Sequence, residues 1–439
     1  MFQMIKHHPY FRHIKSSVFG FMFLLPTSLF ALSLLLLLAC NGFSVFYIYL
    51  PGYLKSSPEP IKLLPENLSG DKTVAKLVSS VMYALKEENP PGVLKIHLSL
   101  AKKPNFSMVP IGKASVFKPK QAGLSRQILR TLGSGTKPKG FFSSKVKTFF
   151  WNSKCKSRFF MTWISPIESL SDRELLAIES VFKFHPKACL VIVSNSLDSK
   201  KGSVVLKPFS DMGFKLIAVH PDFDYIFKNT YAETWFNRLK KGNINPGEVS
   251  LGQNLSNLLR LALLYKYGGV YLDTDVLVLK SIKRLRNVIS AQSINPETKN
   301  WSRLNNAVLI FDQNHPLLFK FIQEFALTFD GNRWGHNGPY LVSRVVERVT
   351  GRPGLNFTVL PPSAFYPVDW TRIRSLFQGP QNETHSNWLK LKLGQIRRQS
   401  YAIHLWNRQS KQVKVQEGSI IHHIISDCCI FCNSLKSKF

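Results

Sequence analysis

The segment 251–279 limits the possible folds of this chain more than any other part. Leu251–Tyr267 carries apolar residues at helical spacing and is followed by two glycines, where a residue that ends a helix is expected. Val270–Leu279 is apolar except for three residues in its middle and predicts a strand. Side chains two positions apart share a face of a strand, so we expect Asp273 and Asp275 to lie side by side.

This pair of carboxylates predicts a cation site. Two neighbouring negative charges repel each other, and burying them costs free energy unless a cation or hydrogen-bond donors compensate. Carboxylate oxygens are ligands that Mg²⁺ and Mn²⁺ prefer, and the end of a strand in an α/β sheet is where such folds bind ligands. Asp273 and Asp275 therefore indicate a Mn²⁺ or Mg²⁺ site.

Strand-like and helix-like runs alternate after residue 155. Strand-like runs occur at Arg158–Ile164, Ala188–Val193 and Phe214–Val219, of which 188–193 is continuously apolar, and Asp172–Phe184 has the spacing of a helix. Strands joined by helices form βαβ units, whose parallel sheet is buried on both faces. We therefore predict an α/β fold with a mostly parallel central sheet that is flanked by helices.

The N-terminal part predicts a membrane anchor. No charged residue occurs between Lys15 and Lys55, and the core of this stretch, Leu29–Tyr49, has about the length of a membrane-spanning helix. The stretch is longer than the apolar core of a cleavable signal peptide, and basic residues precede it. We expect an uncleaved type II anchor, with the C-terminal part of the chain in the lumen of the secretory pathway.

The chain is expected to have five parts. No acidic residue occurs between Glu88 and Glu168, and the segment 51–150 is rich in Lys, Pro, Ser and Gly, which indicates a tether. The predicted parts are a cytoplasmic tail (1–17), a transmembrane signal anchor (18–50), a basic stem (51–150), a half with the acid pair (151–300) and a C-terminal half (301–439).

The net charge of +32 is typical of proteins that bind nucleic acid or an anionic surface. A lumenal location makes nucleic acid an unexpected partner and favours acidic headgroups or polyanionic glycans. Glycosylation acceptors of the Asn-X-Ser/Thr type support this location. They occur at Asn67, Asn105, Asn254, Asn300, Asn356 and Asn382.

Five cysteines lie outside the predicted span, at positions 155, 189, 428, 429 and 432. The spacing of the C-terminal cluster lacks the second ligand pair of a zinc site. An oxidising lumen favours disulfides instead. We therefore expect a disulfide between the C-terminal cluster and either Cys155 or Cys189.

The run Asn254–Asp275 closely resembles the DXD sugar-binding region of the α-1,4-glycosyltransferase family, which includes globotriaosylceramide-synthase-like proteins and plant relatives. The resemblance extends from about residue 159 to 433. It includes Trp163–Pro166, Ser194–Ser196, Asn305–Phe311 and Gly335–Tyr340. It implies a GT-A-like fold, a UDP-sugar donor and transfer with retention, with 151–300 as the nucleotide-sugar half and 301–439 as the acceptor side.

The resemblance also implies roles for the residues of the segment. Asp273 corresponds to the first DXD acid, which faces the sugar and ribose, and Asp275 to the direct metal ligand. Arg260 matches a basic residue that meets the donor sugar or phosphate; its alternative is an arginine that reaches an internal carboxylate. Asn257 stands where many wider relatives have Asp and is expected to contact donor-sugar hydroxyls.

Further donor and acceptor contacts are expected outside this helix. Tyr271 either flanks the nucleotide or is a core aromatic. His404 and Trp406 lie where several GT-A enzymes return a C-terminal loop to the metal and diphosphate, although an isolated histidine in an apolar strand is more often structural. Asn337 and Gly338 resemble the acceptor-side loop, or form an ordinary turn.

The resulting hypothesis is a metal-dependent retaining glycosyltransferase in the Golgi membrane. It would move a hexosyl unit, of the galactose or N-acetylglucosamine type, from a UDP-sugar to a glycan or glycolipid. Two alternatives stay open. The acids also match the first motif of haloacid-dehalogenase-type phosphatases, in which Asp273 would attack phosphorus and Asp275 would act as acid and base. The third hypothesis is a carbohydrate-binding protein without catalytic activity.

Overall fold

A computed structural model describes residues 140–432 of this chain, all of which belong to one compact unit. The predicted cytoplasmic tail, the transmembrane anchor and nearly all of the stem lie outside these residues. Within 140–432, no helix has the length and apolarity that crossing a membrane requires.

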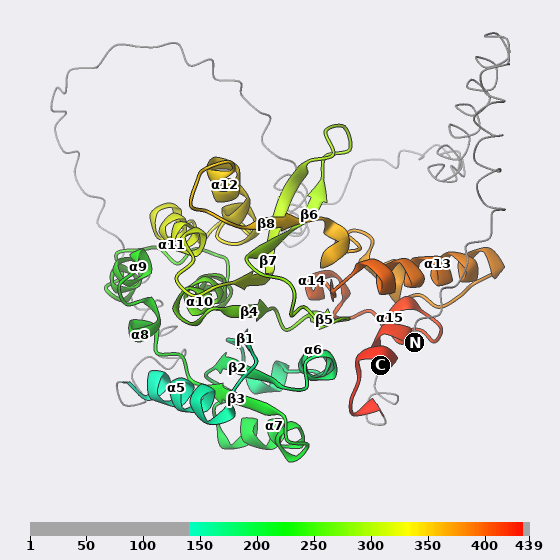
Figure 1. The fold of residues 1–439 in the computed structure, drawn as a ribbon, viewed down its shortest axis with the longest axis horizontal. Helices are drawn as coiled ribbons and strands as arrows, with labels where there is room; N and C mark the ends of the chain where they lie inside the picture. Colours follow the sequence, from blue (N-terminus) through cyan, green and yellow to red (C-terminus); the bar gives the residue numbers. More distant parts are fainter. Residues whose placement is uncertain (1–139, 433–439) are drawn as a thin grey trace, which may run out of the picture. The chain divides into compact units, whose positions relative to one another are not determined.

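The core of the fold is a seven-stranded sheet with the order β3-β2-β1-β4-β7-β6-β8 (Figure 1). The four strands from β3 to β4 are parallel, as predicted, and β7 runs antiparallel to both of its neighbours, so the sheet is mixed. The strands are β1 (Ser157–Trp163), β2 (Ala188–Ser194), β3 (Lys215–Val219), β4 (Gly269–Leu272), β6 (Val288–Ile294), β7 (Trp301–Phe311) and β8 (Thr358–Leu360).

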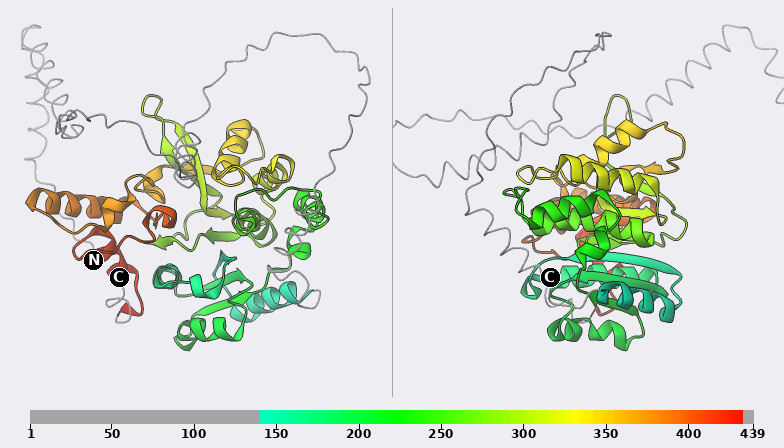
Figure 2. Two further views of the ribbon diagram at one scale, coloured as in Figure 1. Left: turned by 180° about the vertical axis from the view of Figure 1, so that it is seen from behind. Right: turned by 90° about the vertical axis from the view of Figure 1, so that its left-hand side faces the viewer.

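Helices cover both faces of this sheet (Figure 2). Neighbouring strand residues point to opposite sides, and Phe159 and Phe160 accordingly belong to two separate hydrophobic clusters. One cluster includes residues of α5 (Phe141–Ser153), α8 (Phe223–Phe227), α9 (Tyr231–Lys240), α10 (Leu251–Tyr267), α11 (Pro316–Thr328) and α12 (Pro339–Val349). The other includes residues of α6 (Asp172–Phe184), α7 (Lys200–Asp211), α13 (Glu383–Gln399) and α15 (Ile420–Cys428). The predicted helices 172–184 and 251–267 are confirmed.

The prediction of one strand from 270 to 279 is wrong. β4 ends at Leu272, and after a turn the chain enters β5 (Val276–Val278), which pairs with β9 (Ala402–His404) in a separate two-stranded sheet. The turn is closed by a hydrogen bond from the Val276 N–H to the Asp273 carbonyl. The two carboxylates therefore lie in a turn between strands, and not on one face of a strand.

The predicted disulfide is also wrong. The bonds are Cys155–Cys189 and Cys429–Cys432, and Cys428 is a buried free thiol. Because β1 and β2 are adjacent parallel strands, the residues that enter them lie next to each other, and the Cα atoms of Cys155 and Cys189 are 5.6 Å apart. Cys429 and Cys432, which follow α15, form a local bond.

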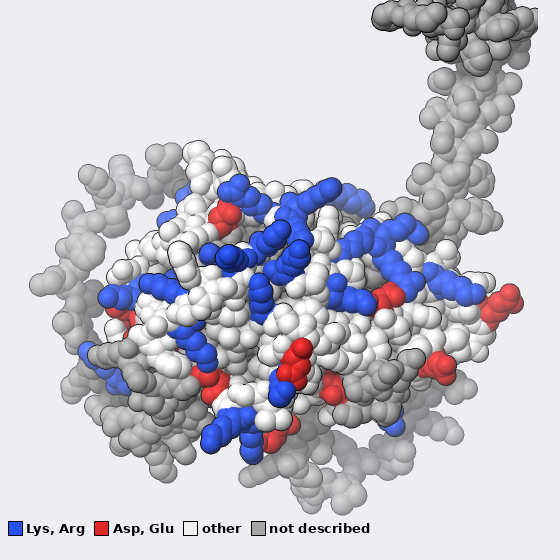
Figure 3. Space-filling view, turned by 60° about the horizontal axis from the view of Figure 1, so that its bottom comes forward, with Lys and Arg blue, Asp and Glu red and all other residues white. Residues whose placement is uncertain are grey.

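Basic side chains are also abundant on the surface of the folded part. Figure 3 shows Lys and Arg gathered over one face, with fewer acidic side chains scattered among them. The positive charge of the chain is therefore not confined to the predicted stem.

Candidate active site

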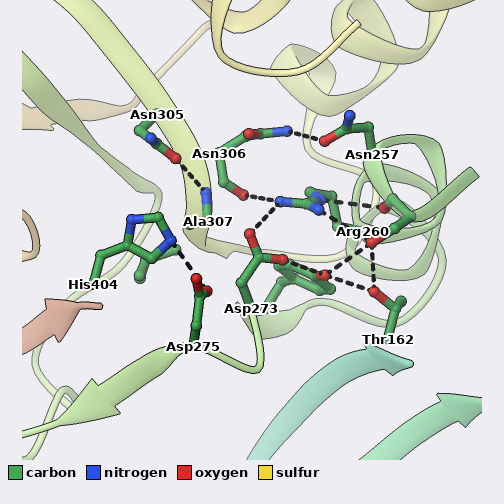
Figure 4. A network of polar contacts seen from close by, with 12 residues as sticks. Thr162, Asn257, Arg260, Asp273, Asp275, Asn305, Asn306, Ala307 and His404 are labelled. Carbon is green, nitrogen blue, oxygen red and sulfur yellow. Dashed lines mark hydrogen bonds and ion pairs between the residues drawn. The ribbon is translucent and has the colours of Figure 1, made fainter. Parts of the chain in front are cut away.

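Asp273 and Asp275 lie in the turn where the chain leaves the central sheet. The Asp273 N–H donates to the carbonyl of Ala307 on β7 at 2.9 Å, and Asp273 directly follows the last residue of β4. Figure 4 shows the two side chains of the turn with the residues around them. The exposed fraction of the Asp273 side chain is 27% and that of the Asp275 side chain is 16%. Both carboxylates are thus largely shielded from water, yet each remains reachable by a ligand.

The pairing of β5 with β9 brings His404 to this turn. Val276 and His404 are register partners, and His404 Nε2 lies 3.1 Å from Asp275 Oδ1. One ligand atom each from Asp273, Asp275 and His404 lies within 4.8 Å of the others. Two carboxylates and one imidazole are a donor set that suits a divalent metal ion. The structure therefore brings together three of the predicted donor-side residues.

Asp273 is held by two buried side chains. Arg260 Nη1 donates to Asp273 Oδ2 at 3.0 Å, and the Tyr271 hydroxyl donates to Asp273 Oδ1 at 2.8 Å. Burial raises the pKa of Asp273 above its ordinary value, and the Arg260 guanidinium offsets part of this effect. The two hydrogen bonds hold both oxygens of the Asp273 carboxylate in place.

All three nitrogens of the Arg260 guanidinium donate to protein groups. Besides Asp273, it donates to the carbonyl of Asn306 at 2.9 Å and to the hydroxyl and carbonyl of Ser256 at 3.1 and 3.2 Å. Its carbon also lies 4.6 Å from the centre of the Tyr271 ring. This arrangement matches the alternative prediction, in which the arginine reaches an internal carboxylate. A contact between Arg260 and the donor stays a prediction.

Asp275 is held by the segment after β9. The Asn407 N–H donates to Asp275 Oδ2 at 3.0 Å. Burial acts to raise the pKa of Asp275, but the nearby His404 ring and the Asn407 N–H outweigh it, so the pKa lies below its ordinary value. The side chain of Asn407 donates in turn to Glu174 Oε1 at 3.1 Å, and Glu174 is a buried residue in the first turn of α6.

Trp406 and Tyr271 are buried supports in this structure. Trp406 adopts a left-handed backbone (φ 52°), its ring centre lies 4.1 Å from that of His404, and its Nε1 donates to the Val368 carbonyl at 3.0 Å. Tyr271 is fully buried, and its hydroxyl also lies 2.8 Å from that of Thr162. Tyr271 is therefore a core aromatic, as the alternative prediction stated. A contact of the Tyr271 or Trp406 ring with the nucleotide stays a prediction.

The predicted acceptor-side residues pack against the predicted donor-side helix. Asn257 Oδ1 accepts from Asn306 Nδ2 at 3.0 Å, and a Cβ atom at Gly338 would lie 2.9 Å from Asn257 Oδ1. Asn337 Nδ2 donates to Asn254 Oδ1 at 3.0 Å. Asn337 therefore fixes the position of its loop on α10, and glycine at 338 permits this close approach.

Several residues of the site were not predicted from the sequence. Asn306 lay within a segment that carried the family resemblance, and Asn407 follows the predicted Trp406 directly, so a local signal existed for both. Glu174 gave no such signal, because an acid in the first turn of a helix is ordinarily a helix-capping residue. Its Oε2 does accept from the Ser171 N–H at 2.8 Å, while its Oε1 faces Asn407.

Two family regions match the chain, and each contains part of this site. Residues 171–301 match a glycosyltransferase sugar-binding region containing a DXD motif, and residues 310–436 match an alpha 1,4-glycosyltransferase conserved region. The first region contains Asp273 and Asp275, and the second contains His404. The fold and these matches define a glycosyltransferase domain.

Relatives of the chain support the same assignment. Lactosylceramide 4-alpha-galactosyltransferase of Pongo pygmaeus is 31% identical over 205 residues, which are 45% of this chain and 85% of that protein. An uncharacterized protein of Arabidopsis thaliana is 30% identical over 312 residues, which are 69% of this chain but 46% of that protein. Human alpha-1,4-N-acetylglucosaminyltransferase is 27% identical and covers 44% of this chain and 52% of that protein. The chain therefore belongs to the α-1,4-glycosyltransferase family, although it spans only about half the length of two of these relatives.

Among solved structures, galactosyltransferase LgtC in complex with donor and acceptor sugar analogs aligns with 64% of this chain and 100% of its own. The sequence identity is 11% and the TM-score is 0.33.

Proposed function

We propose that this protein is a metal-dependent retaining glycosyltransferase with a GT-A-like donor site. It transfers a hexosyl unit from a UDP-sugar to a glycan or glycolipid. The observation that carries the proposal is the convergence of Asp273, Asp275 and His404, whose ligand atoms lie within 4.8 Å of one another at the end of a parallel strand.

The geometry of this group suits a Mn²⁺ or Mg²⁺ ion. His404 Nε2 and Asp275 Oδ1 are 3.1 Å apart. Adjacent ligands of an octahedral ion with bonds of about 2.1 Å are separated by about 3 Å. Asp275 and His404 would therefore hold the ion as neighbouring ligands, and Asp273 would complete the protein side of the site.

Transfer requires that the negative charge on the leaving group, UDP, is stabilised. A divalent ion held by Asp273, Asp275 and His404 would stabilise the negative charge that develops on the departing UDP. Arg260 and Tyr271 hold Asp273, and Asn407 holds Asp275, so that neither carboxylate must reorganise during the reaction.

Retention follows from attack on the same face of the sugar. The bond between the anomeric carbon and the phosphate oxygen breaks, and the bond between that carbon and the acceptor oxygen forms. The proton of the acceptor hydroxyl passes to the departing phosphate. This route needs no enzymatic nucleophile, and the proposal assigns the two carboxylates of the turn to the metal ion.

The donor sugar, acceptor and location follow by analogy with the relatives and from the N-terminal sequence. The names of the relatives specify α-1,4-linked galactose and N-acetylglucosamine as transferred sugars, and lactosylceramide as one acceptor. The apolar segment 18–50 and the glycosylation acceptors beyond it support a type II Golgi membrane protein with a lumenal catalytic domain.

The family assignment argues against the phosphatase alternative, because both matched regions belong to glycosyltransferases. A carbohydrate-binding protein without activity is distinguished by donor hydrolysis. The full chain, purified in detergent, is incubated with Mn²⁺ and a panel of UDP-sugars without acceptor. We expect slow release of UDP from one or two donors and its loss in excess EDTA. Tight binding of UDP with no hydrolysis or transfer would favour the non-catalytic alternative.

A further inference from the structure

A tryptophan meets the arginine that directly follows Asn407, a hydrogen-bond partner of Asp275. Trp334 lies in the loop 329–338 between α11 and α12, and Arg408 lies in the short helix α14 (Asn407–Ser410). The guanidinium carbon of Arg408 is 4.7 Å from the centre of the Trp334 ring. Arg408 is exposed and Trp334 is half-buried, so this contact is at the surface of the domain.

The position of this contact is set on both sides by residues of the site. Arg408 directly follows Asn407, whose N–H donates to Asp275 at 3.0 Å. On the other side, Asn337 ties the loop of Trp334 to α10, and Gly338 packs against Asn257. The ring of Trp334 therefore lies between a loop that is tied to α10 and the segment that holds Asp275.

The loop that carries Trp334 is fixed before any ligand binds. A Cβ atom at Gly331 would lie 1.9 Å from the Pro246 carbonyl oxygen, and the Val249 N–H donates to the Gly331 carbonyl at 2.8 Å. The loop is thus locked against the segment that leads into α10. A ring on such a support is preorganised, so a ligand that stacks on it does not have to order the loop.

The Arg408 side chain that covers the Trp334 ring is easily displaced. A cation–π contact at an exposed site contributes little, because water competes for the guanidinium. An arginine on a four-residue helix can turn its side chain into solvent or toward an anion without disturbing the core. The face of Trp334 that Arg408 covers is therefore available to a flat, weakly polar ligand surface.

We infer that Trp334 is the platform on which the acceptor sugar ring stacks, and that Arg408 covers this platform until the acceptor arrives. The inference rests on the proposed transferase function and extends it to the acceptor. The C–H face of a pyranose ring packs on the negative face of an indole. Arg408, which contacts the ring, directly follows Asn407, whose N–H donates to Asp275, so the platform adjoins the segment that holds the metal-binding turn.

The sheet topology assigns this platform to the acceptor and not to the uracil of the donor. The nucleotide is expected at the carboxyl ends of the parallel strands β1–β3, on one side of β4. α12, which follows the loop of Trp334, packs on β7, on the other side of β4. In Figure 1, α12 and α14 lie above β4, whereas β1–β3 lie below it.

The test compares Trp334→Ala, Trp334→Phe and a matched control, Trp151→Ala, in the full chain purified in detergent. Trp151 is 84% exposed on α5 and takes no part in the site. UDP affinity in Mn²⁺ is measured by calorimetry. Transfer is measured with the UDP-sugar that wild type hydrolyses and a panel of β-galactosides, β-glucosides and β-N-acetylglucosaminides.

We expect Trp334→Ala to raise the acceptor KM by about tenfold or more, with UDP affinity within about twofold of wild type. Trp334→Phe should recover most of the loss, and Trp151→Ala should match wild type. An unchanged acceptor KM in Trp334→Ala overturns the inference, as does weakened UDP binding, which would make the ring part of the donor site. Wild type that binds UDP but accepts no sugar of the panel also overturns it. Wild type that neither binds nor hydrolyses any UDP-sugar contradicts the proposed function itself.

Discussion

His404 Nε2 lies 3.1 Å from Asp275 Oδ1, although 129 positions separate the two residues in the sequence. The contact exists because β9 pairs antiparallel with β5, the strand that begins directly after Asp275. Each of the two matched family regions therefore supplies part of the same candidate metal site. Neither region contains a complete site alone, and the following predictions test how its parts depend on one another.

Asp275→Asn should abolish transfer and donor hydrolysis while the fold is retained. The substitution keeps the size of the side chain but removes the charge that would hold the cation, and we expect a loss of at least about a hundredfold in rate. Rates and circular dichroism are measured on the same preparation. Turnover at the wild-type rate, or wild-type turnover that survives excess EDTA, would contradict the metal-dependent mechanism.

Arg260→Lys should lower the free energy of unfolding by about 1–3 kcal/mol, because lysine keeps the charge but cannot reach Asp273, Asn306 and Ser256 together. Chemical denaturation measures the effect. The matched control is Arg286→Lys, at a surface ion pair with Asp312, for which we expect less than about 1 kcal/mol. A variant with unchanged stability and weakened UDP binding would place Arg260 in the donor site.

Asn407→Ala should weaken Mn²⁺ binding by about tenfold. The backbone N–H that donates to Asp275 remains, but the tether from the Asn407 side chain to Glu174 is lost, so the segment after β9 is held less firmly. Manganese affinity is followed by electron paramagnetic resonance, a readout that is independent of activity. Gln409→Ala, two residues further along the same helix, is the control. Equal manganese affinities in wild type and Asn407→Ala would exclude a positioning role for this tether.

His185 should make the protein less stable in mild acid. The residue is 1% exposed, and burial, with a smaller effect of Lys283, lowers its pKa to about 4. In the unfolded chain the pKa is about 6.5, so between these values the unfolded state binds more protons than the folded state. The free energy of unfolding should therefore fall as the pH falls, by up to about 1.4 kcal/mol per pH unit from this group.

His185→Gln is the variant that isolates this effect. Glutamine cannot titrate, but its side-chain oxygen can still accept from the Ile282 N–H that His185 Nε2 accepts at 3.2 Å. Urea unfolding of both proteins is compared at about pH 7, 6 and 5. The stability difference between them should shift in favour of the variant as the pH falls; a constant difference would refute the prediction.

Asn254 should carry no glycan even when the chain passes through the secretory pathway. Its side chain is 2% exposed and accepts a hydrogen bond from Asn337, whereas Asn300, Asn356 and Asn382 are exposed. Glycopeptide mass spectrometry of protein from eukaryotic cells measures occupancy at each position. Occupancy at any of the three exposed positions would also support a lumenal domain. A glycan on Asn254 would mean that the start of α10 is open during folding.

Local patterns in the sequence were sufficient for the central helices and for the nature of the site. The apolar spacing of residues 172–184 and 251–267 depends on neighbours three and four positions apart, and both helices have the predicted bounds. The acids at 273 and 275 likewise mark the site because two charges in an apolar run need a partner wherever the run is placed. The resemblance to a DXD region, and hence the family, also lay in this contiguous segment.

Only the tertiary structure decided which of these residues contact one another. The break after Leu272, the pairing of β5 with β9 and the Cys155–Cys189 bond depend on which strands become neighbours, and no local spacing encodes that choice. The guanidinium of Arg260 turned toward Asp273 for the same reason, because only the folded chain places a buried carboxylate within its reach. Residue types thus determined which chemistry is available, and long-range packing determined which groups meet to perform it.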